Sequence, residues 1–236
     1  DPDVQMSSNQ KFLFWLILAA ALFFRLYDLG RASYQIDEIN VVQFAVQEKG
    51  LLTAYRTELD RFLFMHRLPL LMIILHAAIA WFHDAAAAFP SEFVTRLPFA
   101  LIGFLSLPLF YQLGRRLAGP AGGLWVMALA ALSPFHIFYS REAYDYSMLL
   151  AFSAGVLWSG LELLQGWRME HRLRPRWAVA FNLFAVALLH AHLSGLVFLA
   201  MWCAVLGVIL LTHPETRRFN RIVPALGVLG LSFFFF

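Results

Sequence analysis

The sequence predicts an all-α, polytopic membrane protein, and its composition is the first observation that predicts this fold class. Of the 236 residues, 61% are hydrophobic and 14% are charged, whereas a soluble domain carries about 45–50% apolar and about 25% charged residues. The 24 Phe and 7 Trp exclude a disordered chain, and the single Cys excludes a disulfide scaffold. With a net charge of only +3, the sequence gives no reason to expect a nucleic-acid partner.

Long apolar runs are the second observation, and they predict about seven membrane crossings. About 20 apolar residues span a bilayer, and about 17 suffice where flanking side chains snorkel. The first run contains Arg25 near its end, from where we expect the side chain to reach the lipid headgroups. The last run stops after 15 residues, so we expect this single transmembrane module to be the N-terminal part of a longer chain. The predicted crossings are residues 12–27, 97–113, 124–139, 146–165, 177–193, 195–212 and 222–236.

One further apolar run, residues 68–82, is expected to lie in the membrane interface rather than to cross. If it does not cross, three short loops share one side with the N-terminus: residues 114–123, 166–176 and 213–221. They contain nine Arg and only two acidic residues, and the positive-inside rule assigns such loops to the cytoplasm. The region from about Gly30 to Arg96 then becomes a long outer loop. Within it, residues 39–49 have a helical apolar period and predict a second interfacial helix.

An acidic pair in this outer loop, Asp37–Glu38, is the first candidate site. Adjacent carboxylates repel each other, so one can keep a raised pKa and act as a base, or both can share a cation. The alternative is a solvated acidic pair or a helix N-cap, since Asp37 directly precedes an amphipathic helix. From the spacing alone this alternative is favoured, because a dipeptide is a weak motif.

The second candidate site is the charged segment at residues 140–147, on the same predicted side of the membrane. If this segment is helical, Glu142 and Asp145 share a face beside Arg141. A capping and salt-bridge cluster is the alternative. Arg96 and Arg141 could each hold a lipid phosphate through their forked donors, and we expect both to face one outer cavity. Headgroup anchoring is the alternative for these arginines.

The order of these features resembles a known family. A first helix, an acidic pair in a long outer loop and the stretch TRLPFALIGFLSLPLFYQLGRRLAG…SPFHIFYSREAYDYS are similar to the polyprenyl-phosphate-sugar-dependent glycosyltransferases of the C superfamily (GT-C). The nearest group is the bacterial dolichyl-phosphate-mannose–protein mannosyltransferase-like family, which includes the lipid A aminoarabinose transferases. The resemblance runs from about Phe12 to Phe152, and residues 96–147 are its most specific part.

The resemblance implies a role for each matching residue. Asp37 matches the catalytic aspartate of the family, and Glu38 matches its acidic neighbour. The segment at 140–147 matches a frequent Ser-Gln-Glu-Ala-Arg-x-Tyr-Ser pattern, except that Arg141 stands in the Gln position and Tyr144 in the Arg position. Arg141 would then have to neutralise the donor phosphate from a different direction. The expected catalytic residues are Asp37 and Glu38, and the expected substrate-binding residues are Arg96, Arg141, Glu142, Asp145 and Tyr146.

The resemblance also implies the reaction and its location. We expect a sugar to move from a polyprenyl-phosphate donor to a hydroxyl of a protein, lipid or glycan acceptor, at the outer face of the bacterial cytoplasmic membrane. No cofactor is implied, although a divalent cation could take part; His190 and His192, two residues apart, are poorly spaced for a metal. The alternative is a non-catalytic family member that serves as an accessory subunit of a larger membrane complex, which the change at Tyr144 favours. A transporter fits less well, because the acidic clusters lie at loop level rather than at the bilayer midplane.

Overall fold

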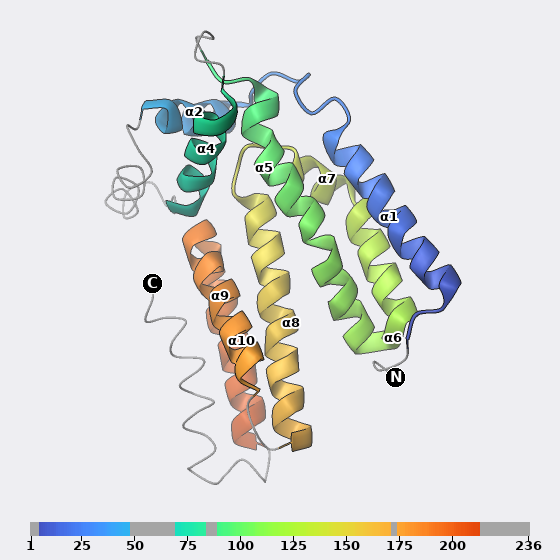
Figure 1. The fold of residues 1–236 in the computed structure, drawn as a ribbon. Helices are drawn as coiled ribbons and strands as arrows, with labels where there is room; N and C mark the ends of the chain where they lie inside the picture. Colours follow the sequence, from blue (N-terminus) through green and yellow to red (C-terminus); the bar gives the residue numbers. More distant parts are fainter. Residues whose placement is uncertain (1–4, 48–68, 84–88, 171–173, 213–236) are drawn as a thin grey trace.

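The structure, a computed structural model, describes residues 5–47, 69–83, 89–170 and 174–212, and these residues are helical with no β-strand (Figure 1). The predicted all-α fold class is therefore confirmed. The predicted crossing at 222–236, the loop at 213–221 and much of the outer loop (48–68) lie outside the described residues. The helices are α1 (Ser8–Leu26), α2 (Ile36–Gln47), α4 (Pro69–Phe82), α5 (Glu92–Leu105), α6 (Leu107–Leu132), α7 (Pro134–Ser140), α8 (Tyr146–Glu170), α9 (Pro175–Ala191) and α10 (Ser194–Thr212).

Three helical stretches are long and apolar enough to cross a membrane. They are Ser8–Leu26, Glu92–Leu132 and Tyr146–Trp167. Three shorter apolar helices accompany them, at Pro69–Phe82, Pro175–Ala191 and Ser194–Ile209. The chain is therefore a membrane protein by the length and composition of its helices.

The longest of these stretches covers the predicted crossing at 97–113 and the first part of that at 124–139, and it reverses direction within α6. Gly119 has φ 71° and ψ −173°, a backbone conformation that essentially only glycine adopts. Across the reversal the two halves touch: a Cβ on Gly114 would lie 2.6 Å from the carbonyl oxygen of Gly122, and one on Gly123 would lie 2.7 Å from that of Tyr111. Glycines therefore allow both the turn and the close approach of the helices that flank it.

The helices form a bundle with two ends, which we name by their elements (Figure 1). At the α2 end, α2 and α4 lie across the tops of α5 and α9, and α4 contacts α2, α5 and α9. At the opposite end, which we call the hairpin end, α6 reverses direction, α8 ends and α9 begins. The short helix α7 returns the chain from α6 to the α2 end, where α8 begins.

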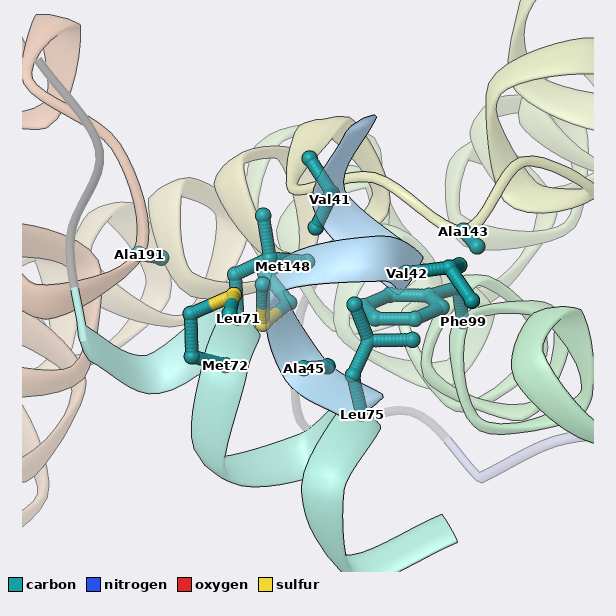
Figure 2. Close-up of a cluster of buried hydrophobic side chains, with 10 residues drawn as sticks. All are labelled: Val41, Val42, Ala45, Leu71, Met72, Leu75, Phe99, Ala143, Met148 and Ala191. Carbon is teal, nitrogen blue, oxygen red and sulfur yellow. The ribbon is translucent and has the colours of Figure 1, made fainter. Parts of the chain in front are cut away.

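A buried hydrophobic cluster fixes the orientation of α2. Figure 2 shows α2 residues facing α4, with a phenylalanine of α5 beside them. On α2 the buried residues recur at helical spacing (38, 41, 42 and 45), so they form one stripe on one face of the helix. The cluster consists of Val41, Val42, Ala45, Leu71, Met72, Leu75, Phe99, Ala143, Met148 and Ala191.

Two helix boundaries differ from the sequence predictions in ways that affect the site. The helix predicted at 39–49 begins earlier, at Ile36, so Asp37 lies inside its first turn rather than at an N-cap before it. Residues 141–145, between α7 and α8, form turns and bends rather than a helix. The condition under which Glu142 and Asp145 would share a helix face is therefore not met.

Candidate active site

The two adjacent acids of α2 occupy opposite environments. Glu38 continues the buried stripe of Val41, Val42 and Ala45 and is only 1% exposed. Asp37, one helical step away, is exposed. Successive helical residues point about 100° apart, so the core that buries one acid leaves the other on the surface. The sequence pair is thus one buried carboxylate and one accessible carboxylate.

Glu38 forms a two-point ion pair with Arg96 of α5. The Arg96 Nε donates to Glu38 Oε1 at 2.8 Å, and Nη2 donates to Oε2 at 2.6 Å. The remaining guanidinium hydrogens donate to backbone carbonyl oxygens of Leu29 (3.3 Å), Ala32 (2.7 Å) and Ser33 (3.2 Å). An arginine has five N–H groups, and these contacts use all five. Arg96 therefore holds the segment after α1 in place, and Arg96 has no N–H left for a phosphate.

Glu38 also joins the two segments that the sequence predicted as separate candidate sites. Its Oε1 accepts a hydrogen bond from the backbone N–H of Ala143 at 2.7 Å, and its Oε2 accepts one from Gln35 at 3.0 Å. Burial alone would raise the pKa of Glu38, but the Arg96 guanidinium and these two N–H groups hold its pKa below the ordinary value. Glu38 is therefore held ionised, which makes it a poor proton acceptor.

A cavity of about 480 Å³ lies at this junction, between the segment after α1, the end of α6 and α7. Arg96 and Arg141 both line it, in agreement with the prediction that they face one cavity. The lining combines apolar side chains with charged and amide groups. The lining residues are Leu29, Ala32, Ser33, Gln35, Glu38, Arg96, Leu132, Pro134, Ile137, Phe138, Arg141 and Glu142.

Arg141 is held against the end of α1. Its Nη1 donates to the carbonyl oxygen of Phe24 at 3.2 Å, and its Nη2 donates to that of Asp28 at 3.1 Å. A cation is favourable at a helix C-terminus, where unpaired carbonyls concentrate negative charge. These bonds use two of its five N–H groups. Among the described contacts, the other N–H groups of Arg141 have no acceptor, and Arg141 lines the cavity.

Glu142 is the second buried carboxylate of the cavity, with 8% of its surface exposed. Burial raises its pKa, and the negative charges of Glu38 and Asp37 add to the effect, while Arg96 opposes it. Asp37 therefore lies near enough to Glu142 for the two carboxylates to interact. The cavity combines a paired carboxylate, a carboxylate with a raised pKa and an accessible carboxylate close by.

The raised pKa of Glu142 predicts a pH dependence of stability. Its contribution is fully present below the ordinary pKa of about 4.5 and is lost as the pH rises through the higher folded value. We therefore expect Glu142→Gln to gain thermal stability relative to the wild type as the pH rises from about 4.5 toward neutrality. The unfolding temperatures of both proteins in detergent, measured across this range, test it. A difference that stays constant with pH would contradict the assignment.

Asp145 and Tyr146 do not line the cavity. Asp145 is 4% exposed, and the Tyr146 ring belongs to an aromatic cluster with Tyr139 (centroids 4.6 Å apart) and Tyr144 (5.1 Å). Among the described residues, no group of three His, Cys, Asp or Glu side chains could hold a metal ion.

Comparison with known proteins identifies the family of this chain. Residues 69–236 match the family described as dolichyl-phosphate-mannose-protein mannosyltransferase. The chain belongs to this family. No curated protein and no solved structure matches it significantly. As a member of the mannosyltransferase family, the protein belongs to the general class of membrane glycosyltransferases.

The matched region contains only part of the predicted site of this mannosyltransferase-family protein. It includes Arg96, Arg141 and Glu142, but it begins after the acidic pair Asp37–Glu38. What links the pair to the matched region is the geometry: Glu38 binds both Arg96 and the backbone of Ala143. Tyr144, which stands where the resemblance predicts an arginine, stacks in the aromatic cluster at the start of α8.

One buried polar network of this family member was missed from the sequence. Arg25 does not reach the headgroups; it is fully buried and donates to the carbonyl oxygen of Ala21 at 3.0 Å. Its Nη2 lies 3.0 Å from His136 Nδ1. Because arginine can only donate, Nδ1 accepts and the His136 proton is on Nε2, 3.1 Å from Ser106 Oγ. The network ties α1 to α7, the helix that contributes Pro134, Ile137 and Phe138 to the cavity.

Proposed function

We propose that the protein transfers a sugar from a polyprenyl-phosphate donor to a hydroxyl acceptor at the outer face of the bacterial cytoplasmic membrane. The observation that carries this proposal is the shared cavity at the α2 end, which has Arg141 and Glu142 in its wall and Asp37 nearby. Membership of the mannosyltransferase family supports a sugar-transfer reaction. The arginine-rich loops at the hairpin end support a cytoplasmic N-terminus and an outward-facing site.

In this proposal the apolar and the charged residues of the cavity both bind the lipid donor. The apolar residues, which include Leu132, Ile137 and Phe138, receive the first part of the prenyl chain. The guanidinium of Arg141 binds the phosphate. As the bond between the anomeric carbon and the phosphate oxygen breaks, negative charge grows on the phosphate, and a fixed cation stabilises that charge.

Asp37 completes the reaction as general base. The acceptor oxygen attacks the anomeric carbon, the phosphate leaves with the bonding electron pair, and the hydroxyl proton passes to the Asp37 carboxylate. Glu38, which the resemblance implied as a second catalytic acid, is a positioning residue here, because Arg96 and two N–H groups saturate it. Arg96 is likewise a positioning residue. Asp145 and Tyr146, which do not line the cavity, take no direct part in this proposal.

Loss of the phosphate-binding cation should weaken catalysis. We expect Arg141→Gln to lower kcat/KM for a polyprenyl-phosphate sugar by roughly 10–100-fold, because hydrogen bonds to charged groups contribute about 1.5–3 kcal/mol each. The assay is sugar transfer in proteoliposomes that contain the full chain. The matched control is Arg31→Gln, which removes an arginine that is 81% exposed at the same end of the bundle. Equal kcat/KM values for the two variants would show that Arg141 does not bind the donor phosphate.

A second candidate function rests on Tyr144. If the missing arginine is essential, the chain is a non-catalytic subunit of a larger membrane complex. The purified complex would then contain stoichiometric partner proteins, and the chain itself would transfer no sugar.

A further inference from the structure

A second cavity lies at the hairpin end, far from the proposed active site. It has a volume of about 290 Å³. Glu162 in its wall lies about 24 Å along α8 from Tyr146, given a rise of about 1.5 Å per residue. The cavity therefore lies at the opposite end of the bundle from Asp37. Its lining residues are Gln112, Arg115, Arg116, Trp158, Glu162, Arg174, Arg176 and Trp177.

The lining of this cavity has an excess of positive charge. Arg116 pairs with Glu162 at 2.6 Å, and both side chains are largely buried. Among the described lining residues four are arginine and one, Glu162, is a carboxylate, so this part of the lining carries more positive than negative charge. Two of the arginines also stand at the N-terminus of α9, where Arg174 is the N-cap, and the first turn contains no acidic residue. Cations are unfavourable there, because a helix N-terminus is itself positive.

The arginine and tryptophan residues of this lining include buried hydrogen-bond donors and closely packed aromatic rings. The Nε of Arg116 and the indole N–H of Trp177 are buried and have no hydrogen-bond partner among the described residues. Buried donors without an acceptor are uncommon in proteins. Trp158 and Trp177 pack edge to face with centroids 4.9 Å apart, and the Arg176 guanidinium lies 5.4 Å from the Trp177 ring centre.

We propose that this cavity binds the phosphate headgroup of an anionic membrane lipid. The ligand must bring negative charge and several acceptor oxygens, and a phosphate supplies both to guanidinium groups in a two-point geometry. Tryptophan is enriched at the level of the headgroups, and basic pockets between membrane helices bind anionic lipids. A soluble phosphate offers the same oxygens, so the test must separate the two sources.

The test measures lipid-dependent stabilisation of the purified full chain in detergent. The probes are phosphatidylglycerol, phosphatidylcholine, glycerol 3-phosphate and inorganic phosphate. The variant is Arg174→Gln/Arg176→Gln, and the control is Lys11→Gln/Arg31→Gln, which removes two positive charges outside the cavity. We expect phosphatidylglycerol alone to raise the unfolding temperature, and its Kd to weaken at least about tenfold in the variant but not in the control.

A purely structural role for these arginines would give a different result. Without lipid, the variant should unfold close to the wild-type temperature; only the response to lipid should disappear. Equal weakening in variant and control, or stabilisation by phosphatidylcholine as well, would overturn the proposal. Tight binding of inorganic phosphate would show that the ligand is a soluble anion and not a lipid. If the double variant does not fold, Arg176→Gln against Lys11→Gln gives the same comparison.

Discussion

Asp37→Asn is expected to lower sugar transfer by about 10²–10⁴-fold and to leave the folded protein intact. General-base assistance contributes a factor of this size, and Asp37 is the exposed carboxylate beside the cavity. Its position on the surface of α2 means that the substitution disturbs neither the Val41–Val42 core nor the Glu38–Arg96 pair. The measurement is the rate of transfer from a polyprenyl-phosphate sugar in proteoliposomes, with the unfolding temperature recorded for the same samples.

The matched control for Asp37→Asn is Asp28→Asn. Asp28 is also an exposed aspartate at the α2 end, and its positive φ of 58° is a conformation that Asn tolerates well. We expect this control to retain transfer close to the wild-type rate. If Asp37→Asn also retained it, the general-base role of Asp37 would be excluded.

Breaking the Glu38–Arg96 pair is expected to have the largest effect on stability. Arg96→Met leaves the Glu38 carboxylate buried without its cation, and removing one partner of a buried ion pair costs about 3–5 kcal/mol. The lost contacts also include three carbonyl oxygens of the segment after α1, so the cavity should lose its shape. The free energy of unfolding, or the unfolding temperature in detergent, measures the effect.

Two comparisons make this prediction specific to burial. Arg31→Met breaks an exposed pair with Asp28 at 2.9 Å and should cost no more than about 1 kcal/mol. Replacing both buried partners, as in Glu38→Leu/Arg96→Met, should recover much of the loss, because no charge is then left unpaired. Equal destabilisation by Arg96→Met and Arg31→Met would contradict the structural role assigned to the pair.

The predictions for Asp37 and for the Glu38–Arg96 pair give different roles to two acids that the sequence could not distinguish. From the dipeptide alone, either acid could be the base. The spacing of Glu38 with Val41, Val42 and Ala45 carries the missing signal, because these four positions lie on one helical face. Reading the helix from Ile36 rather than from residue 39 would have shown that Glu38 is buried and Asp37 is not.

Features governed by local periodicity were predictable from the sequence, and contacts between distant segments were not. Apolar run lengths predicted the all-α fold class. The pairing of Glu38 with Arg96 and the burial of Arg25 beside His136 depend on how helices pack, which no local pattern records. Glu142 and Asp145 do not share a helix face, because residues 141–145 form turns and bends between α7 and α8.

The closest test of the proposed function is the identity of the sugar donor. Full-length protein in proteoliposomes is supplied with a labelled sugar either on a polyprenyl monophosphate or on a nucleotide, together with a hydroxyl acceptor. We predict that label moves to the acceptor from the polyprenyl-phosphate donor only, and that Asp37→Asn abolishes most of this transfer. Transfer from the nucleotide donor alone, or no transfer by a folded chain that copurifies with stoichiometric partners, would contradict the account.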